Sequence, residues 1–203
     1  MTANRIKHAA LTLFAESGYE GVSLSEIAKS VGIKTPSIYA HFESKEQLLL
    51  ELIDDAIREE HAKFMQMLAE TTDHPPMDRL NAAFIFYTDL DHISQGQSFL
   101  KRTLLVPPRH LEERLGQDFI AYENQVSEHL MELLNRSVLS VGGFHPESEQ
   151  TERLLALFYA LIDGLLVEYK LYDSALYRRR QALIWDCLRE SVERTTPKPQ
   201  PRA

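Results

Sequence analysis

The chain has 203 residues, of which 44% are hydrophobic and 26% charged, and its formal net charge is −8. This length permits one sizeable core, or a small domain joined to a larger one. The single cysteine, Cys187, excludes an internal disulfide, and no charged-then-apolar leader opens the sequence, so we expect a reducing, cytoplasmic location.

The acidic balance is a first objection to nucleic-acid binding, because phosphate contacts depend on positive charge. The distribution of charge weakens this objection. Residues 1–45 carry five basic and four acidic side chains, so the acidic excess lies in the rest of the chain. A small, nearly neutral domain could therefore hold DNA through a local patch while an acidic body stays away from the phosphates.

Glycine and proline are scarce and fall between segments of helical periodicity, which predicts an all-α fold without strands. The long helix that starts at Ser44 has capping-box spacing, because Gln47 follows three residues later. The predicted helices cover residues 4–17, two short segments within 24–42, a long segment from 44 to about 73, then 77–94, 97–105, 109–139, 148–172 and 174–194.

The stretch 23–42 carries start and stop signals for two short helices. Ser23 and Glu26 have capping-box spacing, so the first helix begins directly after Ser23. Ala28 is small enough to let a second helix cross closely. Gly32 permits the left-handed conformation that ends the first helix and turns the chain sharply. The pattern predicts a helix-turn-helix.

The second short helix is expected to be capped by Thr35, with Pro36 at its first position, where no amide hydrogen is missed. Ile38 and Phe42 lie four residues apart and anchor it inward. Its N-terminal end is polar and fits a major groove, because the first residues of such a helix reach base edges. Later side chains and the free amides at helix starts are placed to bond phosphates. The candidate DNA-binding residues are Ser23, Ser25, Lys29, Lys34, Thr35, Ser37, Tyr39, His41 and Lys45.

These residues resemble the tetracycline-repressor (TetR/AcrR-like) family of bacterial transcriptional regulators. The match covers about the first 50 residues and rests on several coupled spacings. Where the family commonly has serine, this chain has Lys34 at a position expected to touch DNA, so its operator cannot be taken from a relative. The matching elements are Ala-Ala-Leu-x-Leu-Phe-x-x-x-Gly-Tyr over residues 9–19, Ile27-Ala28, Val31-Gly32-Ile33, Ile38-Tyr39-x-His41-Phe42 and Lys45-x-x-Leu48.

The resemblance implies a three-helix DNA-binding domain, residues 1–46, and a larger helical domain, residues 47–203, for effector binding and dimerisation. It implies a homodimeric repressor that binds a palindromic operator and is released by a small, hydrophobic effector. A two-fold protein needs half-sites about 34–36 Å apart, or a multiple of that spacing. The expected partners are operator DNA, a second copy of the chain and an unidentified small molecule, with no cofactor, metal or membrane.

The run 154–167 is apolar on all sides of its predicted helix, so something beyond its own domain must cover part of it. It is too short to cross a bilayer, which takes about 20 residues. With the last helix it predicts half of a four-helix dimer interface, the alternative being deep burial within one subunit. Cys187 is interpreted as a small buried residue. The interface residues are Leu154, Leu157, Leu161, Leu165, Leu176, Leu183, Ile184 and Leu188.

An effector pocket leaves the weakest signal in this sequence. A few aromatic and polar residues of the C-terminal part could line an apolar cavity, although each taken alone is read more readily as core. Asp163 could pair with a cationic ligand or accept a buried hydrogen bond. The candidates are Phe84, Tyr87, His92, Phe99, Tyr122, Phe158, Tyr159 and Asp163.

Catalytic alternatives find little support in the sequence. A carboxylate-bridged di-metal bundle needs Glu-x-x-His spacing, and none of the eight histidines has a glutamate three residues before it. The HExxH motif, a glycine-rich phosphate loop and paired cysteines are also absent from the sequence. We therefore predict a regulator that is not an enzyme. The alternative is a helical adaptor that binds only protein, which would not require the polar face of Lys34, Thr35 and Ser37.

Overall fold

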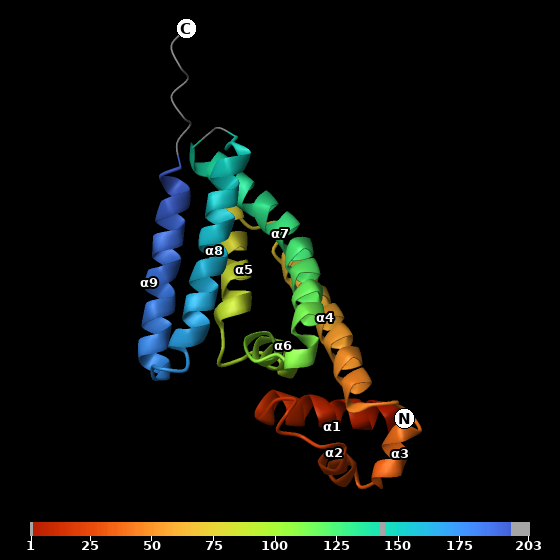
Figure 1. Ribbon diagram of the computed structural model, residues 1–203. Helices are drawn as coiled ribbons and strands as arrows, with labels where there is room; N and C mark the ends of the chain where they lie inside the picture. The colour runs from red at the N-terminus through yellow and green to blue at the C-terminus, as the bar shows by residue number, and fades with distance from the viewer. Residues whose placement is uncertain (1, 143–144, 196–203) are drawn as a thin grey trace. The chain divides into compact units, whose positions relative to one another are not determined.

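A computed structural model describes residues 2–142 and 145–195, and within these residues all regular structure is helical (Figure 1). The predicted all-α fold is therefore confirmed. The elements in chain order are α1 (Thr2–Ser17), α2 (Leu24–Val31), α3 (Thr35–Tyr39), α4 (Lys45–Glu70), α5 (Pro76–Thr88), α6 (Gln95–Leu105), the 3-10 helix η1 (Arg109–Leu111), α7 (Glu112–Gly142), α8 (Ser148–Glu168) and α9 (Ser174–Glu193).

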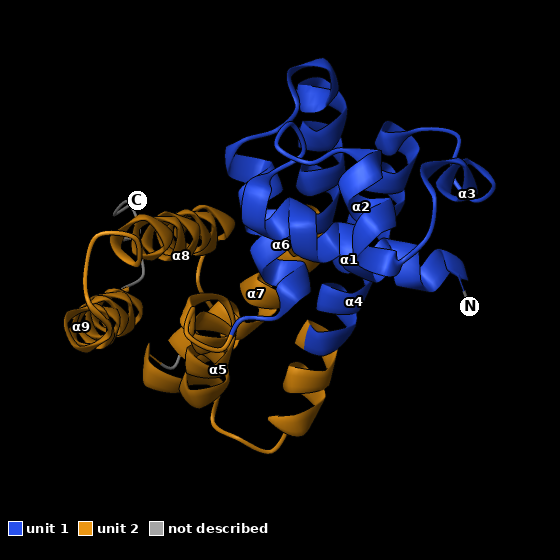
Figure 2. Cartoon of the chain, turned by 90° about the horizontal axis from the view of Figure 1, so that it is seen from below, with its two compact units in different colours: residues 1–63, 93–123 blue, residues 64–92, 124–203 orange. Residues whose placement is uncertain are grey.

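The chain divides into two compact units, each made of two separate segments (Figure 2). Unit 1 contains residues 1–63 and 93–123, and unit 2 contains residues 64–92 and 124–203. The boundary predicted after residue 46 differs from this division. Helix α6, η1 and the first part of α7 belong to the same unit as α1–α3, although residues 40–94 lie between α3 and α6 in the sequence.

The core of unit 1 forms around the buried face of α1. Ile6, Ala10 and Phe14 follow the helical repeat and are all buried. Helix α2 contributes Ile27 to the same cluster, and α6 contributes Phe99, which is 0% exposed. Thus α6 completes the hydrophobic core of the segment that carries the helix-turn-helix.

Polar contacts fasten α1 to its neighbours in unit 1. The Nζ of Lys7 lies 2.9 Å from Oε2 of Glu51 and 2.8 Å from Oδ2 of Asp55. These two carboxylates stand four residues apart and therefore share one face of α4. On the α6 side, the Gln95 side-chain amide donates to Oγ1 of Thr12 at 2.7 Å.

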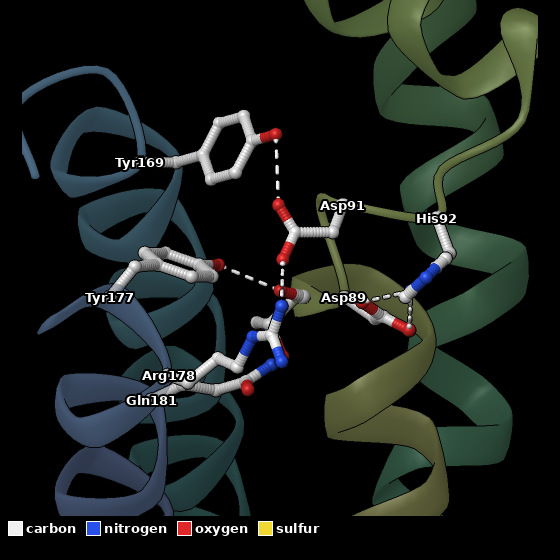
Figure 3. Close-up of polar contacts among 8 residues, drawn as sticks. Asp89, Asp91, His92, Tyr169, Tyr177, Arg178 and Gln181 are labelled. Atoms are coloured by element: carbon white, nitrogen blue, oxygen red, sulfur yellow. Dashed lines mark hydrogen bonds and ion pairs between the residues drawn. The ribbon is translucent and has the colours of Figure 1, made fainter. Parts of the chain in front are cut away.

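In unit 2, a polar cluster fixes the C-terminal end of α5 against α8 and α9 (Figure 3). The buried Tyr177 hydroxyl donates to the Thr88 carbonyl at 2.7 Å, and Gln181 donates to Oγ1 of Thr88 at 2.8 Å. Asp91 accepts from the Tyr169 hydroxyl at 3.2 Å and pairs with Arg178 at 3.1 Å. Burial raises the pKa of Tyr177, so it stays a donor at all physiological pH values.

This cluster explains why α5 ends at Thr88, whereas the sequence pattern predicted a helix up to residue 94. The carbonyl of Thr88, the last residue of α5, accepts from the Tyr177 hydroxyl of α9, and the chain then continues to α6. Ser94 caps α6 by accepting from the Gln97 amide at 2.9 Å, so α6 begins at Gln95, two residues before the predicted start. Helix α8 likewise ends at Glu168, four residues before the predicted end.

The role of α6 in the core of unit 1 predicts a large effect of Phe99→Ala. Truncating this fully buried ring leaves a cavity and should lower the free energy of unfolding by about 3–5 kcal/mol. Urea unfolding followed by circular dichroism measures it. Leu105→Ala is the matched control on the same helix, because Leu105 is 61% exposed and should change stability by less than about 0.5 kcal/mol. Similar values for both variants would contradict this packing.

Candidate nucleic-acid interface

Helix α2 begins and ends where the sequence predicted. The Glu26 amide donates to Oγ of Ser23 at 3.2 Å, and the Ser23 amide donates back to Oε2 of Glu26 at 2.7 Å, which completes the capping box. Gly32 has φ 76° and ψ 31°, the left-handed conformation that a side chain would strain. The predicted turn between α2 and α3 is therefore present.

The start of α3 differs by one residue from the prediction that Thr35 caps it. Lys34 has the extended conformation of the capping position, with φ −87° and ψ 147°, and its carbonyl accepts from the Ser37 amide at 2.9 Å. Thr35 is thus already helical, and no side chain caps this helix end. The amides at the start of α3 remain available to an external acceptor.

The predicted DNA-binding residues lie on one short stretch of unit 1, and most of them are exposed. Ile38 and Phe42 are buried and hold α3 in place, while Tyr39 is 57% exposed, which is unusual for a large aromatic side chain. Thr35 and Lys45 are half-buried. The exposed candidates are Ser23, Ser25, Lys29, Lys34, Ser37, Tyr39 and His41.

A surface hollow of about 580 Å³ opens beside α3. Ser23 and Leu24, at the start of α2, and Ser44 and Lys45, at the start of α4, line it together with Tyr39. Two helix N-termini therefore open into one hollow, an arrangement that suits a phosphate. Its rim also carries the carboxylates Glu20, Glu26 and Glu43.

Lys45 does not extend freely from the start of α4. Its ammonium lies 4.0 Å from the centre of the Tyr19 ring, a cation–π contact. Burial lowers the pKa of Lys45, with the nearby Glu20 and Glu26 acting in the opposite direction. Tyr19 in turn contacts the His110 ring, whose Nε2 lies 3.4 Å from Glu46. The prediction did not include Tyr19 and His110 as residues that hold Lys45 in place.

Arg5 is a further residue that the sequence prediction missed. Its guanidinium donates to the Val31 carbonyl at 2.8 Å and so caps the C-terminus of α2. A shallow hollow of about 400 Å³ surrounds it, lined also by Asn4, His8 and Ser30. The available signal was a basic residue near the start of α1, which alone does not specify a contact 26 residues further along the chain.

Residues 6–52 match the family model described as bacterial regulatory proteins, tetR family. This segment of the chain is thus similar to the DNA-binding region of TetR-family regulators. The match contains α2, the Gly32 turn, α3 and the start of α4, which are the elements that form the interface described above.

Curated relatives match the same TetR segment. The biofilm operon icaADBC HTH-type negative transcriptional regulator IcaR of Staphylococcus aureus is 51% identical over 45 residues, 22% of this chain and 24% of that protein. IcaR of Staphylococcus epidermidis is 40% identical over 52 residues, 26% of this chain and 28% of that protein. The chain thus spans about a quarter of the length of the curated relatives that it matches.

Solved TetR-family structures resemble the fold of nearly the whole chain. A TetR transcriptional regulator from Chloroflexus aurantiacus has a TM-score of 0.77 at 23% identity, covering 95% of this chain and 94% of that one. A TetR-family regulator from Streptomyces coelicolor has a TM-score of 0.75 at 18% identity, covering 95% and 96%. At these low identities, the similarity shows a shared fold.

The residues predicted to line an effector pocket do not come together in one place. Phe99 and Tyr122 belong to unit 1, and Phe99 fills its core. His92 is exposed and bonds Asp89 at 3.0 Å. The prediction was wrong to group Phe99 and Tyr122 with residues of unit 2, because aromatic character alone does not tell which core a side chain enters. His92 does belong to unit 2 but is exposed.

The remaining candidates also belong to unit 2. Phe84 and Phe158 are fully buried and pack edge to face at 6.3 Å, and Trp185 lies 5.5 Å from Phe84. Tyr87 packs against Phe64, whose ring also contacts Phe86 and His129. The Tyr159 hydroxyl bonds Oγ of Ser127 at 2.8 Å, whereas Asp163 is exposed. Unit 2 therefore has an aromatic interior.

The predicted dimer residues divide into buried and exposed groups. Leu154, Leu165 and Leu188 are buried in their own chain, so their side chains offer no surface to a partner, contrary to the prediction. Leu157, Leu161 and Ile184 are half-buried, and Leu176 and Leu183 are exposed. The prediction omitted the exposed Val167 and Leu171, and Cys187 is exposed rather than buried.

The capping box of α2 predicts a pH effect. Hydrogen bonds from the Ser23 hydroxyl and then the Ser23 amide hold the pKa of Glu26 below its usual value of 4.5. A lowered folded-state pKa contributes stability that is present above about pH 4.5 and is lost as the pH falls through the folded value. Glu26→Gln keeps the box but cannot titrate.

The stability advantage of the wild type over Glu26→Gln should therefore shrink between about pH 5 and pH 3, as measured by thermal unfolding at a series of pH values. Glu16→Gln is the control, because Glu16 is exposed and has no hydrogen-bond partner among the described residues. A pH-independent difference between wild type and Glu26→Gln would contradict the role of the ionised carboxylate.

Proposed function

We propose that the chain is a ligand-responsive transcriptional repressor, which binds a palindromic operator as a homodimer and is released by a small, hydrophobic effector. The observation that carries this proposal is the exposed polar start of α3, held by a capped α2 and the Gly32 turn. The description of IcaR as a negative regulator supports repression. Among the described residues, no helix combines the length and the apolar character needed to cross a membrane.

In this proposal the first turn of α3 enters the major groove. Lys34, Thr35 and Ser37 present an ammonium and two hydroxyls to base edges. Tyr39 and His41 follow one turn later and donate to phosphates, as do the amides at the starts of α2 and α4. Lys45 stays on the Tyr19 ring and contributes its charge from that fixed position.

The dimer would use the apolar face that α8 and α9 leave exposed. Val167 on α8 and Leu183 on α9 are each more than half exposed, and Leu176 is 41% exposed. A monomer rarely leaves such side chains gathered in water, and a two-fold interface would cover them with their own copies. The symmetry then presents one recognition helix to each half-site.

The interior of unit 2 favours an apolar effector. Among its described residues the buried polar side chains are Thr88, Ser137 and Thr151, and none of them is charged. A ligand that enters between the aromatic side chains would thus gain stacking and apolar contacts and few ionic ones. The protein-only adaptor is the alternative function, and it differs from the proposal in predicting no DNA affinity.

The phosphate role of Tyr39 predicts that Tyr39→Phe weakens DNA binding about tenfold, because a hydrogen bond to a charged group is lost while the ring remains. Gel shifts with a duplex selected by the wild-type protein from random-sequence DNA measure this. Tyr172→Phe, another exposed tyrosine, lies in unit 2 and should leave the affinity unchanged. Equal binding by wild type and Tyr39→Phe would rule out the contact.

The dimer interface predicts that Leu183→Glu yields monomers, because dimerisation would bury an unpaired carboxylate. Sedimentation analysis at micromolar concentration measures the molecular mass. Ile120→Glu is the matched control, since Ile120 is 61% exposed but belongs to unit 1, and it should remain dimeric. A dimeric Leu183→Glu variant would place the interface elsewhere.

A further inference from the structure

Unit 1 contains one buried carboxylate that the DNA-binding surface does not use. Glu60 on α4 is 1% exposed. Its Oε1 accepts from Oγ of Ser94 at 2.5 Å and from Nζ of Lys63 at 2.8 Å. Its Oε2 is buried and has no hydrogen-bond partner among the described residues. A half-satisfied buried carboxylate costs free energy, so its presence requires an explanation.

The surroundings of Glu60 are shaped to receive it. Ser94 is the N-cap of α6, and its hydroxyl oxygen accepts from the Gln97 amide while its hydrogen goes to Glu60. Gly96 follows in the first turn, where an added Cβ would come within 3.1 Å of Oε1 of Glu60. A side chain at position 96 would therefore push the carboxylate away. The start of α6 is thus joined to α4 through one carboxylate oxygen.

This joint lies where the chain passes between the two units. The chain leaves unit 1 after Lys63, three residues beyond Glu60, and returns at Ile93, one residue before Ser94. Residues 64–92 between these two points belong to unit 2. The hydrogen bond between Glu60 and Ser94, 34 residues apart in sequence, therefore joins the part of unit 1 that precedes residues 64–92 to the part that follows them.

Beyond this joint, α4 and α6 each hold α1. Lys7 binds α4 through Glu51 and Asp55, and α6 binds α1 through the Gln95 bond to Thr12 and the buried Phe99. A displacement of α4 alone, or of α6 alone, would have to break the contacts that the moving helix makes with α1. A displacement of both together keeps the Glu60–Ser94 bond and acts on α1 from two sides.

We propose that Glu60 is a positioning residue that makes α4 and α6 move as one piece, so that a change in residues 64–92 reaches the helix-turn-helix through both helices. The inference rests on the proposed function, because it assigns a route for the ligand response. By thermodynamic reciprocity, DNA bound to unit 1 must alter the same segment of unit 2. DNA can therefore serve as the probe while the effector is unidentified.

The test is hydrogen exchange of the full-length protein with and without the selected duplex. In the wild type, DNA should change the exchange of α5 amides, which lie in unit 2. In Glu60→Met this DNA-induced change should be lost, while amides 96–98 exchange faster without DNA. The unfolding temperature should stay the same or rise, because Met removes the unsatisfied oxygen and Lys63 keeps its pairing with Glu59.

Ser94→Gly is a second, independent variant, which removes the bond to Glu60 and keeps a residue type that caps helices with a small penalty. It should lose the α5 response in the same way. Glu59→Met is the matched control, because Glu59 also pairs with Lys63 but is exposed, and it should respond like the wild type.

Two results would overturn the inference. One is an unchanged α5 exchange when the wild type binds DNA, and the other is a normal α5 response in Glu60→Met and Ser94→Gly. A wild-type protein that selects no duplex would instead show that the proposed function is wrong, which is a separate failure.

Discussion

The burial of one face of α1 is the interaction on which unit 1 depends. Ile6, Ala10 and Phe14 form that face, and both α2 and α6 pack on α1. Helix α2 and its partner α3 are too short to be stable alone, since isolated helices of fewer than about 12 residues are marginal in water. The orientation of α3 is thus set by a core that includes α6.

Charge places a second constraint on the interface. The hollow beside α3 has three carboxylates on its rim and Lys45 as the cation that lines it. Helix amides and hydroxyls would therefore carry a large part of the attraction to phosphate, and few counterions would be released on binding. A surface of this kind binds DNA of arbitrary sequence weakly, which favours discrimination by base contacts over general affinity for the duplex.

Local rules of helix geometry predicted the helix-turn-helix well. The box of Ser23 and Glu26 and the turn at Gly32 depend on residues within a few positions of each other, so the sequence contains the whole interaction. Thr35 was misassigned as the cap because the rule favours its side chain, whereas Lys34 takes the extended conformation required there. The predicted cap of α3 therefore differs from the observed one by one residue.

Contacts distant in sequence could not be predicted in the same way. The end of α5 depends on the Tyr177 hydroxyl, 89 residues further along the chain. Phe99 and Phe84 are both buried phenylalanines on neighbouring helices in the sequence, yet Phe99 packs in the core of unit 1 and Phe84 in that of unit 2. Leu165 on α8 and Leu183 on α9 are both leucines, but Leu165 lies on the buried face of its helix and Leu183 on the exposed face of its own.

The two-segment construction of unit 1 also limits how such a regulator can be rebuilt from parts. A segment cut after residue 46 would carry α3 but leave behind Phe99 and the carboxylate of Glu60. Joined to another body, it would expose the apolar face of α1 unless the new α6 fitted it. If the proposed function holds, a new combination of DNA specificity and ligand response requires α1–α3 and α6 to be exchanged together, although these elements are not contiguous in the sequence.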